Sequence, residues 1–145
     1  MEFYSDWTNK EPIGISLVLF ILSNAFSFLL IYAILDLKKL ERIKGLSRGQ
    51  NSDLIKKIAE TNKWNIYSNN QQMTILNLAW KESSGYDWGK QLTIIYDGTD
   101  ILVNCISFGL YSSPSPFHWF ANKRIINNLK TEFESGIKNV LQQRL

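Results

Sequence analysis

The chain has 145 residues, of which 45% are hydrophobic and 20% charged, and its formal net charge at pH 7 is +3. This length leaves room for one membrane span and one small domain, but not for two full domains. The modest charge does not predict a nucleic-acid partner, and the single cysteine, Cys105, excludes an intrachain disulfide and a cysteine-based zinc site.

An apolar run without any charged side chain extends over residues 13–35. At about 1.5 Å per helical residue it would be roughly 34 Å long, which is enough to cross a hydrocarbon core of about 30 Å. The residues before it lack the basic segment that opens a cleaved signal peptide. We therefore predict a transmembrane helix over residues 13–35, preceded by a short N-terminal segment over residues 1–12.

The charges that flank this run predict its orientation. Basic residues are far more frequent after the run than before it, and those that follow are Lys38, Lys39, Arg42, Lys44 and Arg48. By the positive-inside rule, the N-terminal segment lies outside and the C-terminal domain lies in the cytoplasm. The same side chains can also attract anionic lipid headgroups, although a role in topology alone accounts for them.

Asn24 lies near the middle of the apolar run, between Ser23 and Ser27. An amide in lipid needs a hydrogen-bond partner, and small residues let two helices approach closely. One interpretation is that these three residues contact another helix. The alternative is that Asn24 bonds its own backbone or a water molecule, and the sequence leaves both open.

Residues 36–50 carry Leu37, Leu40 and Ile43 at helical spacing among basic side chains. This pattern predicts either a helical extension of the apolar run or a basic juxtamembrane connector. Beyond it, Asn51 or Ser52 can cap a further helix.

After Trp64 the apolar spacing changes from helical to alternating. The predicted strands cover residues 64–68, 72–81, 90–96 and 101–108, and Asp97-Gly98 predicts a tight hairpin between the last two. Such short connections favour an antiparallel β-meander of three or four strands. Helical spacing returns from Trp119, with Gly136 as a point where that helix bends or ends. Residues 51–145 are therefore predicted to form a small cytoplasmic α+β domain: a helix, the meander and a closing helix.

The side chains that could support catalysis are few and isolated. His118 is the only histidine, Cys105 sits within a strand pattern, and turn chemistry explains Asp97 and Asp100. No nucleotide-binding or metalloprotease motif is present, and we predict neither a cofactor nor a metal. A small membrane-bound enzyme that uses these four side chains is the weakest interpretation.

Aromatic residues are concentrated on two predicted loops. They are Tyr86, Trp88, Tyr111, Phe117 and Trp119. If the loops meet, these rings form a binding patch for a peptide, a partner protein or the bilayer surface. The alternative is that most of them cover the small core.

These features predict a single-pass membrane-anchored interaction module, such as an accessory or scaffolding subunit of a membrane protein assembly. The expected partners are the lipid bilayer and either another membrane protein or a second copy of the chain. A membrane-tethered ligand-binding or sensor domain is the main alternative.

Overall fold

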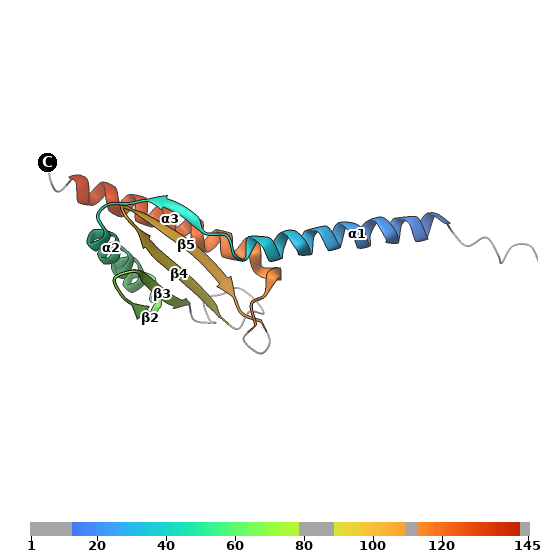
Figure 1. Ribbon diagram of the computed structural model, residues 1–145, viewed down its shortest axis with the longest axis horizontal. Coiled ribbons are helices and arrows are strands. Elements are labelled where there is room, and N and C mark those ends of the chain that lie inside the picture. Colours follow the sequence, from blue (N-terminus) through green and yellow to red (C-terminus); the bar gives the residue numbers. More distant parts are fainter. Residues whose placement is uncertain (1–12, 79–88, 110–112, 143–145) are drawn as a thin grey trace, which may run out of the picture. The chain divides into compact units, whose positions relative to one another are not determined.

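The chain divides into two compact units, Met1–Tyr32 and Ala33–Leu145. The computed structural model describes residues 13–78, 89–109 and 113–142. Its elements in chain order, shown in Figure 1, are α1 (Ile13–Asp36), β1 (Glu41–Lys44), α2 (Arg48–Thr61), β2 (Asn65–Asn69), β3 (Met73–Leu78), β4 (Lys90–Asp97), β5 (Asp100–Ser107), the 3-10 turn η3 (Pro116–His118) and α3 (Trp119–Gln142). The predicted α+β class, with an apolar N-terminal helix and a closing C-terminal helix, is confirmed.

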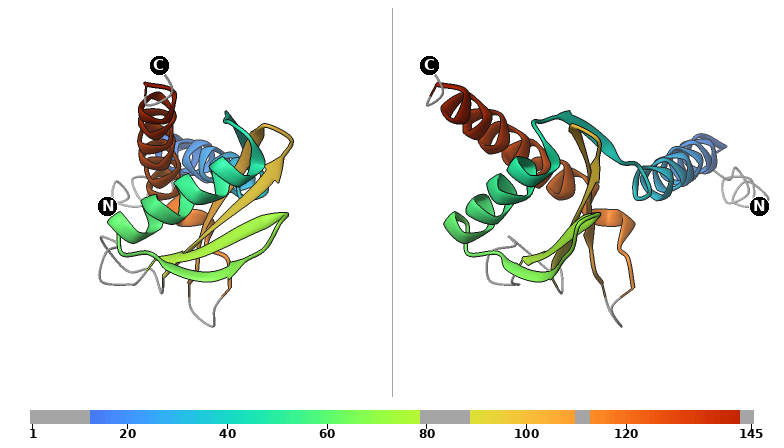
Figure 2. Two further views of the ribbon diagram at one scale, coloured as in Figure 1. Left: turned by 90° about the vertical axis from the view of Figure 1, so that its left-hand side faces the viewer. Right: turned by 60° about the vertical axis from the view of Figure 1, so that its left-hand side comes forward.

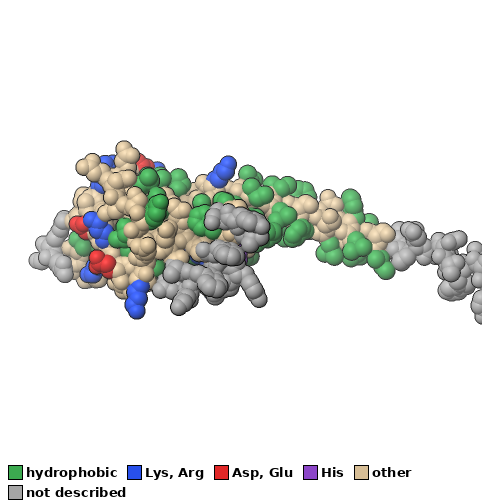
Figure 3. Space-filling model, turned by 90° about the horizontal axis from the view of Figure 1, so that it is seen from below, with side chains coloured by type: hydrophobic (Ala, Val, Ile, Leu, Met, Phe, Trp, Pro, Cys, Tyr) green, Lys and Arg blue, Asp and Glu red, His purple; other side chains and the backbone are tan. Residues whose placement is uncertain are grey.

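Helix α1 coincides with the predicted apolar helix and ends one residue later, at Asp36. It is long and apolar enough to cross a membrane. Most of its large apolar side chains are exposed, from 49% for Tyr32 to 72% for Phe28, and Leu30 is half-buried. Figure 3 shows these side chains along the visible face of the helix. No side of α1 carries a polar stripe of the kind that a water-facing helix needs.

The sheet has five antiparallel strands in the order β1-β5-β4-β3-β2. Strands β2 to β5 follow one another as neighbours, which confirms the predicted meander, and β1 adds a fifth strand beside β5. Side chains along β3, β4 and β5 alternate between buried and half-buried positions. This alternation is the period of two that a strand imposes on its side chains.

Helices α2 and α3 cover one face of this sheet (Figure 2). The largest fully buried side chains of the core are Phe133, Ile43, Ile55, Leu76, Leu92, Ile94, Ile101, Leu129 and Val103. On the second face, Ile75, Ile95 and Leu102 are half-buried.

The predicted helical extension is wrong where the chain forms β1. In the register of β1 and β5, Ile43 lies opposite Ile101 and is 2% exposed, whereas Leu40 stays 42% exposed. Pairing with the edge of β5 satisfies the backbone of this segment and buries Ile43. This tertiary contact outweighs the helical spacing of the apolar residues.

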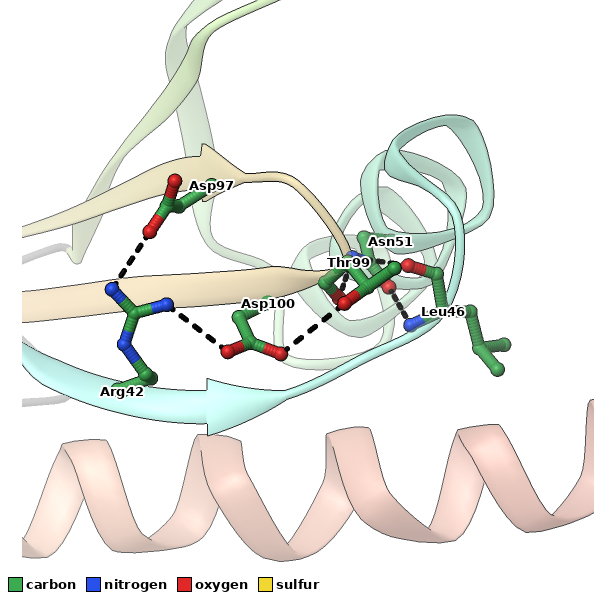
Figure 4. Close-up of polar contacts among 6 residues, drawn as sticks. All are labelled: Arg42, Leu46, Asn51, Asp97, Thr99 and Asp100. Carbon is green, nitrogen blue, oxygen red and sulfur yellow. Dashed lines mark hydrogen bonds and ion pairs between the residues drawn. The ribbon is translucent and has the colours of Figure 1, made fainter.

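Asn51 has a different role from the predicted cap. Helix α2 begins at Arg48, after Ser47, so Asn51 lies inside its first turn and is fully buried. Its Oδ1 accepts the Leu46 N–H at 2.7 Å, and its Nδ2 donates to the carbonyls of Leu46 and Thr99 at 3.3 and 3.0 Å (Figure 4). Asn51 therefore links the β1–α2 connection to the β4–β5 hairpin.

Gly136 does not end α3, which continues to Gln142. A Cβ atom at Gly136 would lie 2.9 Å from Cδ2 of Leu54 on α2. The glycine thus permits a close approach of the two helices on the covered face of the sheet.

Gly45 offers a test of the packing around Asn51. A Cβ atom at this position would lie 2.6 Å from Asn51 Oδ1 and 2.7 Å from the Thr99 carbonyl oxygen. Because the carbonyl belongs to the backbone, we expect Gly45→Ala to lower the free energy of unfolding by about 1–3 kcal/mol. Chemical denaturation of the full chain in detergent micelles measures this change.

The matched control is Gly49→Ala in α2, where a Cβ atom meets nothing within 4 Å. Alanine in a helix is about 1 kcal/mol more favourable than glycine, so this variant is expected to be neutral or stabilised. Equal stability of Gly45→Ala and the wild type would show that the connection is not tightly packed.

Candidate functional site

The polar side chains of α1 make hydrogen bonds within the helix. Asn24 Nδ2 donates to the Phe20 carbonyl at 2.8 Å, and Ser27 Oγ donates to the Ser23 carbonyl at 2.9 Å. Ser27 is thereby satisfied, whereas Asn24 Oδ1 has no partner among the described residues. Contact of Ser23, Asn24 and Ser27 with another helix stays a prediction.

The five predicted membrane-surface basic residues divide into two groups. Arg42 on β1 binds Asp97 at 2.7 Å and Asp100 at 3.0 Å (Figure 4). The hydrogen bonds that Arg42 donates to Asp100 and Asp97 raise the pKa of Arg42, because they favour the charged guanidinium. The other four, which lie outside this cluster, are exposed: Lys38, Lys39, Lys44 and Arg48.

Two of the four side chains considered for catalysis form ion pairs. Asp97 and Asp100 bind one guanidinium, which links β1 to the β4–β5 hairpin. Cys105 is 3% exposed, and His118 is half-buried at the end of η3. Across residues 13–78, 89–109 and 113–142, no three histidine, cysteine, aspartate or glutamate side chains are grouped to hold a metal ion.

Two residues of the predicted aromatic patch can be placed. Phe117 in η3 is 68% exposed, and the half-buried Trp119 stacks on Phe120 with ring centroids 3.5 Å apart. Tyr86, Trp88 and Tyr111 lie outside the described residues. Phe120, which the sequence did not single out, is 70% exposed. Phe120 follows Phe117 by three residues, and residues three apart share one side of a helix. This spacing could have predicted that Phe120 lies beside Phe117.

A cavity of about 220 Å³ opens beside these rings. It lies between the start of α3, strand β5 and the segment that follows α1. The side chains that line it are Asp36, Leu37, Lys39, Glu41, Asn104, Cys105, Trp119, Asn122, Lys123 and Ile126.

Asn122 contributes a buried amide to this cavity. It is 5% exposed, and its Oδ1 accepts a hydrogen bond from Ser107 Oγ at 2.6 Å and a weak one from Cys105 Sγ at 3.8 Å. Its Nδ2 has no hydrogen-bond partner within the described part of the chain. Buried amides are normally satisfied, so this group can donate to a bound oxygen atom. No local pattern of residues predicts this role of Asn122, because its burial depends on the packing of α3 against β5.

Comparison of the chain with protein-family models, with curated proteins and with solved structures gives no match. The proposals below therefore rest on the geometry and chemistry of the chain itself.

Proposed function

We propose that the chain is a single-pass membrane-anchored interaction module, an accessory or scaffolding subunit of a membrane protein assembly. In this proposal α1 crosses the bilayer, the N-terminus lies outside, and the domain of residues 51–145 lies in the cytoplasm. The observation that carries it is the exposure of apolar side chains on every side of α1.

Water is an unfavourable environment for α1. Burial of a large apolar side chain is worth about 1.5–3 kcal/mol, and only 6% of the most apolar window of this helix is buried within the chain. A core helix of a soluble protein would be buried, and a surface helix would have a polar side. A bilayer supplies apolar surroundings on all sides, and the hydrogen bonds within the helix satisfy its backbone there.

Charges after α1 support the proposed orientation. Lys38, Lys39, Lys44 and Arg48 are exposed, and Arg42 keeps 54% of its side chain accessible. The described part of the chain therefore presents positive charge directly after the apolar helix, as cytoplasmic flanks do.

Asn24 supports a partner within the membrane. Its Nδ2 bonds the helix backbone, and its Oδ1 is left to accept a hydrogen bond in a medium without water. A donor from another membrane helix, or from Asn24 of a second copy, would satisfy this oxygen. Each such hydrogen bond stabilises helix association by about 1 kcal/mol.

One observation favours a membrane-tethered ligand-binding or sensor domain as a second candidate. The cavity of about 220 Å³ holds the Asn122 amide, which can donate to a ligand oxygen. The charged residues that line this cavity carry both signs, so a small polar molecule fits the cavity better than an apolar one.

Anchoring is tested by alkaline carbonate extraction of membranes from cells that express the full chain. We expect the wild type to stay in the pellet and Leu19→Arg/Leu22→Arg to be released, because each central arginine costs about 2.5–3.5 kcal/mol in a membrane helix. The matched control is Leu141→Arg on α3, which should stay in the pellet. Release of the wild type would rule out a transmembrane anchor.

The same cells test the orientation. In a Cys105→Ser background, Tyr67→Cys places a thiol at a position that is 71% exposed on β2. A membrane-impermeant maleimide should label it only after permeabilisation. Labelling of intact cells would show that the orientation is reversed.

The interaction role is tested by purification in mild detergent and native mass spectrometry. We expect a stoichiometric protein partner or a dimer, whose yield falls with Asn24→Leu because the polar contact is lost. The matched control, Asn127→Leu, changes an exposed asparagine on α3 and should leave the yield unchanged. A monomer with a retained small molecule would favour the sensor, and equal yields for both variants would contradict the Asn24 contact.

A further inference from the structure

The start of α3 lies beside the point where the chain leaves the compact unit Ala33–Leu145 toward the apolar part of α1. Asp36 is the first charged residue after the apolar run, and its Oδ2 is 3.6 Å from Lys123 Nζ on α3. The same ammonium lies 5.6 Å from the centroid of the Trp119 ring. These residues all belong to one compact unit, so their spacing does not depend on where the rest of α1 lies.

The position of this cluster along the membrane normal follows from the proposed anchor. If the apolar run fills the hydrocarbon core, Asp36 lies in the headgroup layer, which is roughly 5–8 Å thick on each side of a bilayer. Lys123 and Trp119 are within that distance of Asp36 or of each other. Tryptophan is enriched at this level of membrane proteins because its ring is amphipathic.

Two phenylalanines next to this cluster are largely exposed, although one face of the Phe120 ring stacks on Trp119. Phe117 is 68% and Phe120 is 70% exposed. Residues three apart lie on one side of a helical turn, so the two rings form one apolar edge. In water this edge is unfavourable, whereas the boundary between headgroups and acyl chains accommodates it.

Exposed basic side chains lie on the same segments. Arg124 follows Phe120 by four residues and therefore lies on its side of α3. Lys39 lines the cavity together with Trp119, and Lys38 precedes it in the segment after α1. In the described ranges these three exposed cations have no acidic partner, whereas Asp36 pairs with Lys123 and Glu41 pairs with Lys130. The unneutralised charge complements an anionic lipid surface.

From these observations we infer that the start of α3 is a second membrane contact. Phe117 and Phe120 insert into the headgroup boundary of the bilayer that α1 crosses, and Arg124, Lys38 and Lys39 bind anionic headgroups. This inference rests on the proposed membrane anchor and adds to it a lipid surface as the partner of the aromatic edge. It also predicts that the domain has a fixed side toward the membrane.

Nitroxide labels on the full chain test this contact. The chain is placed in nanodiscs of phosphatidylcholine and phosphatidylglycerol, in a Cys105→Ser background, with single labels at Phe117→Cys, Phe120→Cys or Leu22→Cys on α1. The matched control is Leu141→Cys, an exposed apolar position near the other end of α3. Frequent collisions of the nitroxide with oxygen indicate that the label lies in lipid. Frequent collisions with a water-soluble nickel complex indicate that it lies in water.

We expect the ratio of oxygen to nickel accessibility at positions 117 and 120 to be several-fold higher than at position 141. With Phe120→Asp as a second change, the ratio at position 117 should fall toward that at position 141. Omission of phosphatidylglycerol should lower both ratios. All four labelled positions are exposed, so thermal unfolding should confirm that the variants fold.

The outcomes separate the two proposals. A lipid-exposed label at Leu22 with water-exposed labels at Phe117 and Phe120 would overturn the second contact and leave the anchor intact. A water-exposed label at Leu22 would overturn both. Equal ratios at positions 120 and 141 would overturn the contact as well, because the effect would then not be specific to the start of α3.

Discussion

The pairing of β1 with β5 is the constraint on which the arrangement of the compact unit depends. Only Leu37–Leu40 separate α1 from β1. Within this short stretch the Leu37 carbonyl accepts a hydrogen bond from Asn104 Nδ2 at 2.8 Å. Here the last turn of α1 belongs to the same unit as the sheet, so the entry point of the chain and the start of α3 are fixed relative to each other.

Polar contacts at the hairpin end reinforce this pairing. Arg42 joins β1 to both carboxylates of the β4–β5 hairpin, and Asn51 bonds the backbone on both sides of the same junction. The Arg42 contacts are exposed and contribute little to stability individually. Asn51 is fully buried, and its loss would leave partly buried backbone groups of Leu46 and Thr99 without these partners, which is more costly. Arg42 therefore joins the two strands at the surface, whereas Asn51 holds the β1–α2 connection against the β4–β5 hairpin.

Local patterns predicted most of the fold. The apolar run predicts α1, the alternation of apolar and polar residues predicts the meander, and Asp97-Gly98 predicts the hairpin. Each of these elements depends on residues that are neighbours in the sequence. Strand β1 could not be predicted in this way, since its conformation depends on β5, which lies far along the chain, and its apolar spacing resembles that of a helix. Asn51 is a similar case, because asparagine suits both a helix cap and a buried link between backbone segments.

The candidate site residues also differ in whether the local sequence predicts them. Asn24 and the basic flank are visible in the sequence, since they stand out against an apolar run. Phe117 was predicted to belong to an aromatic patch, but Phe120 and Asn122 were missed. Whether an aromatic ring is exposed or an amide is buried depends on how α3 packs on the sheet, and adjacent residues do not determine that.

The position of the domain relative to lipid is the most direct test of a membrane-anchored module with a second membrane contact. Neutron reflectometry of the full chain in a supported bilayer with anionic lipid measures the protein density along the membrane normal. We expect protein density within the hydrocarbon core and continuous protein density from the headgroup layer outward, without an intervening layer of water. A hydrated gap between the headgroups and the domain would contradict the second contact, and absence of protein from the hydrocarbon core would contradict the anchor itself.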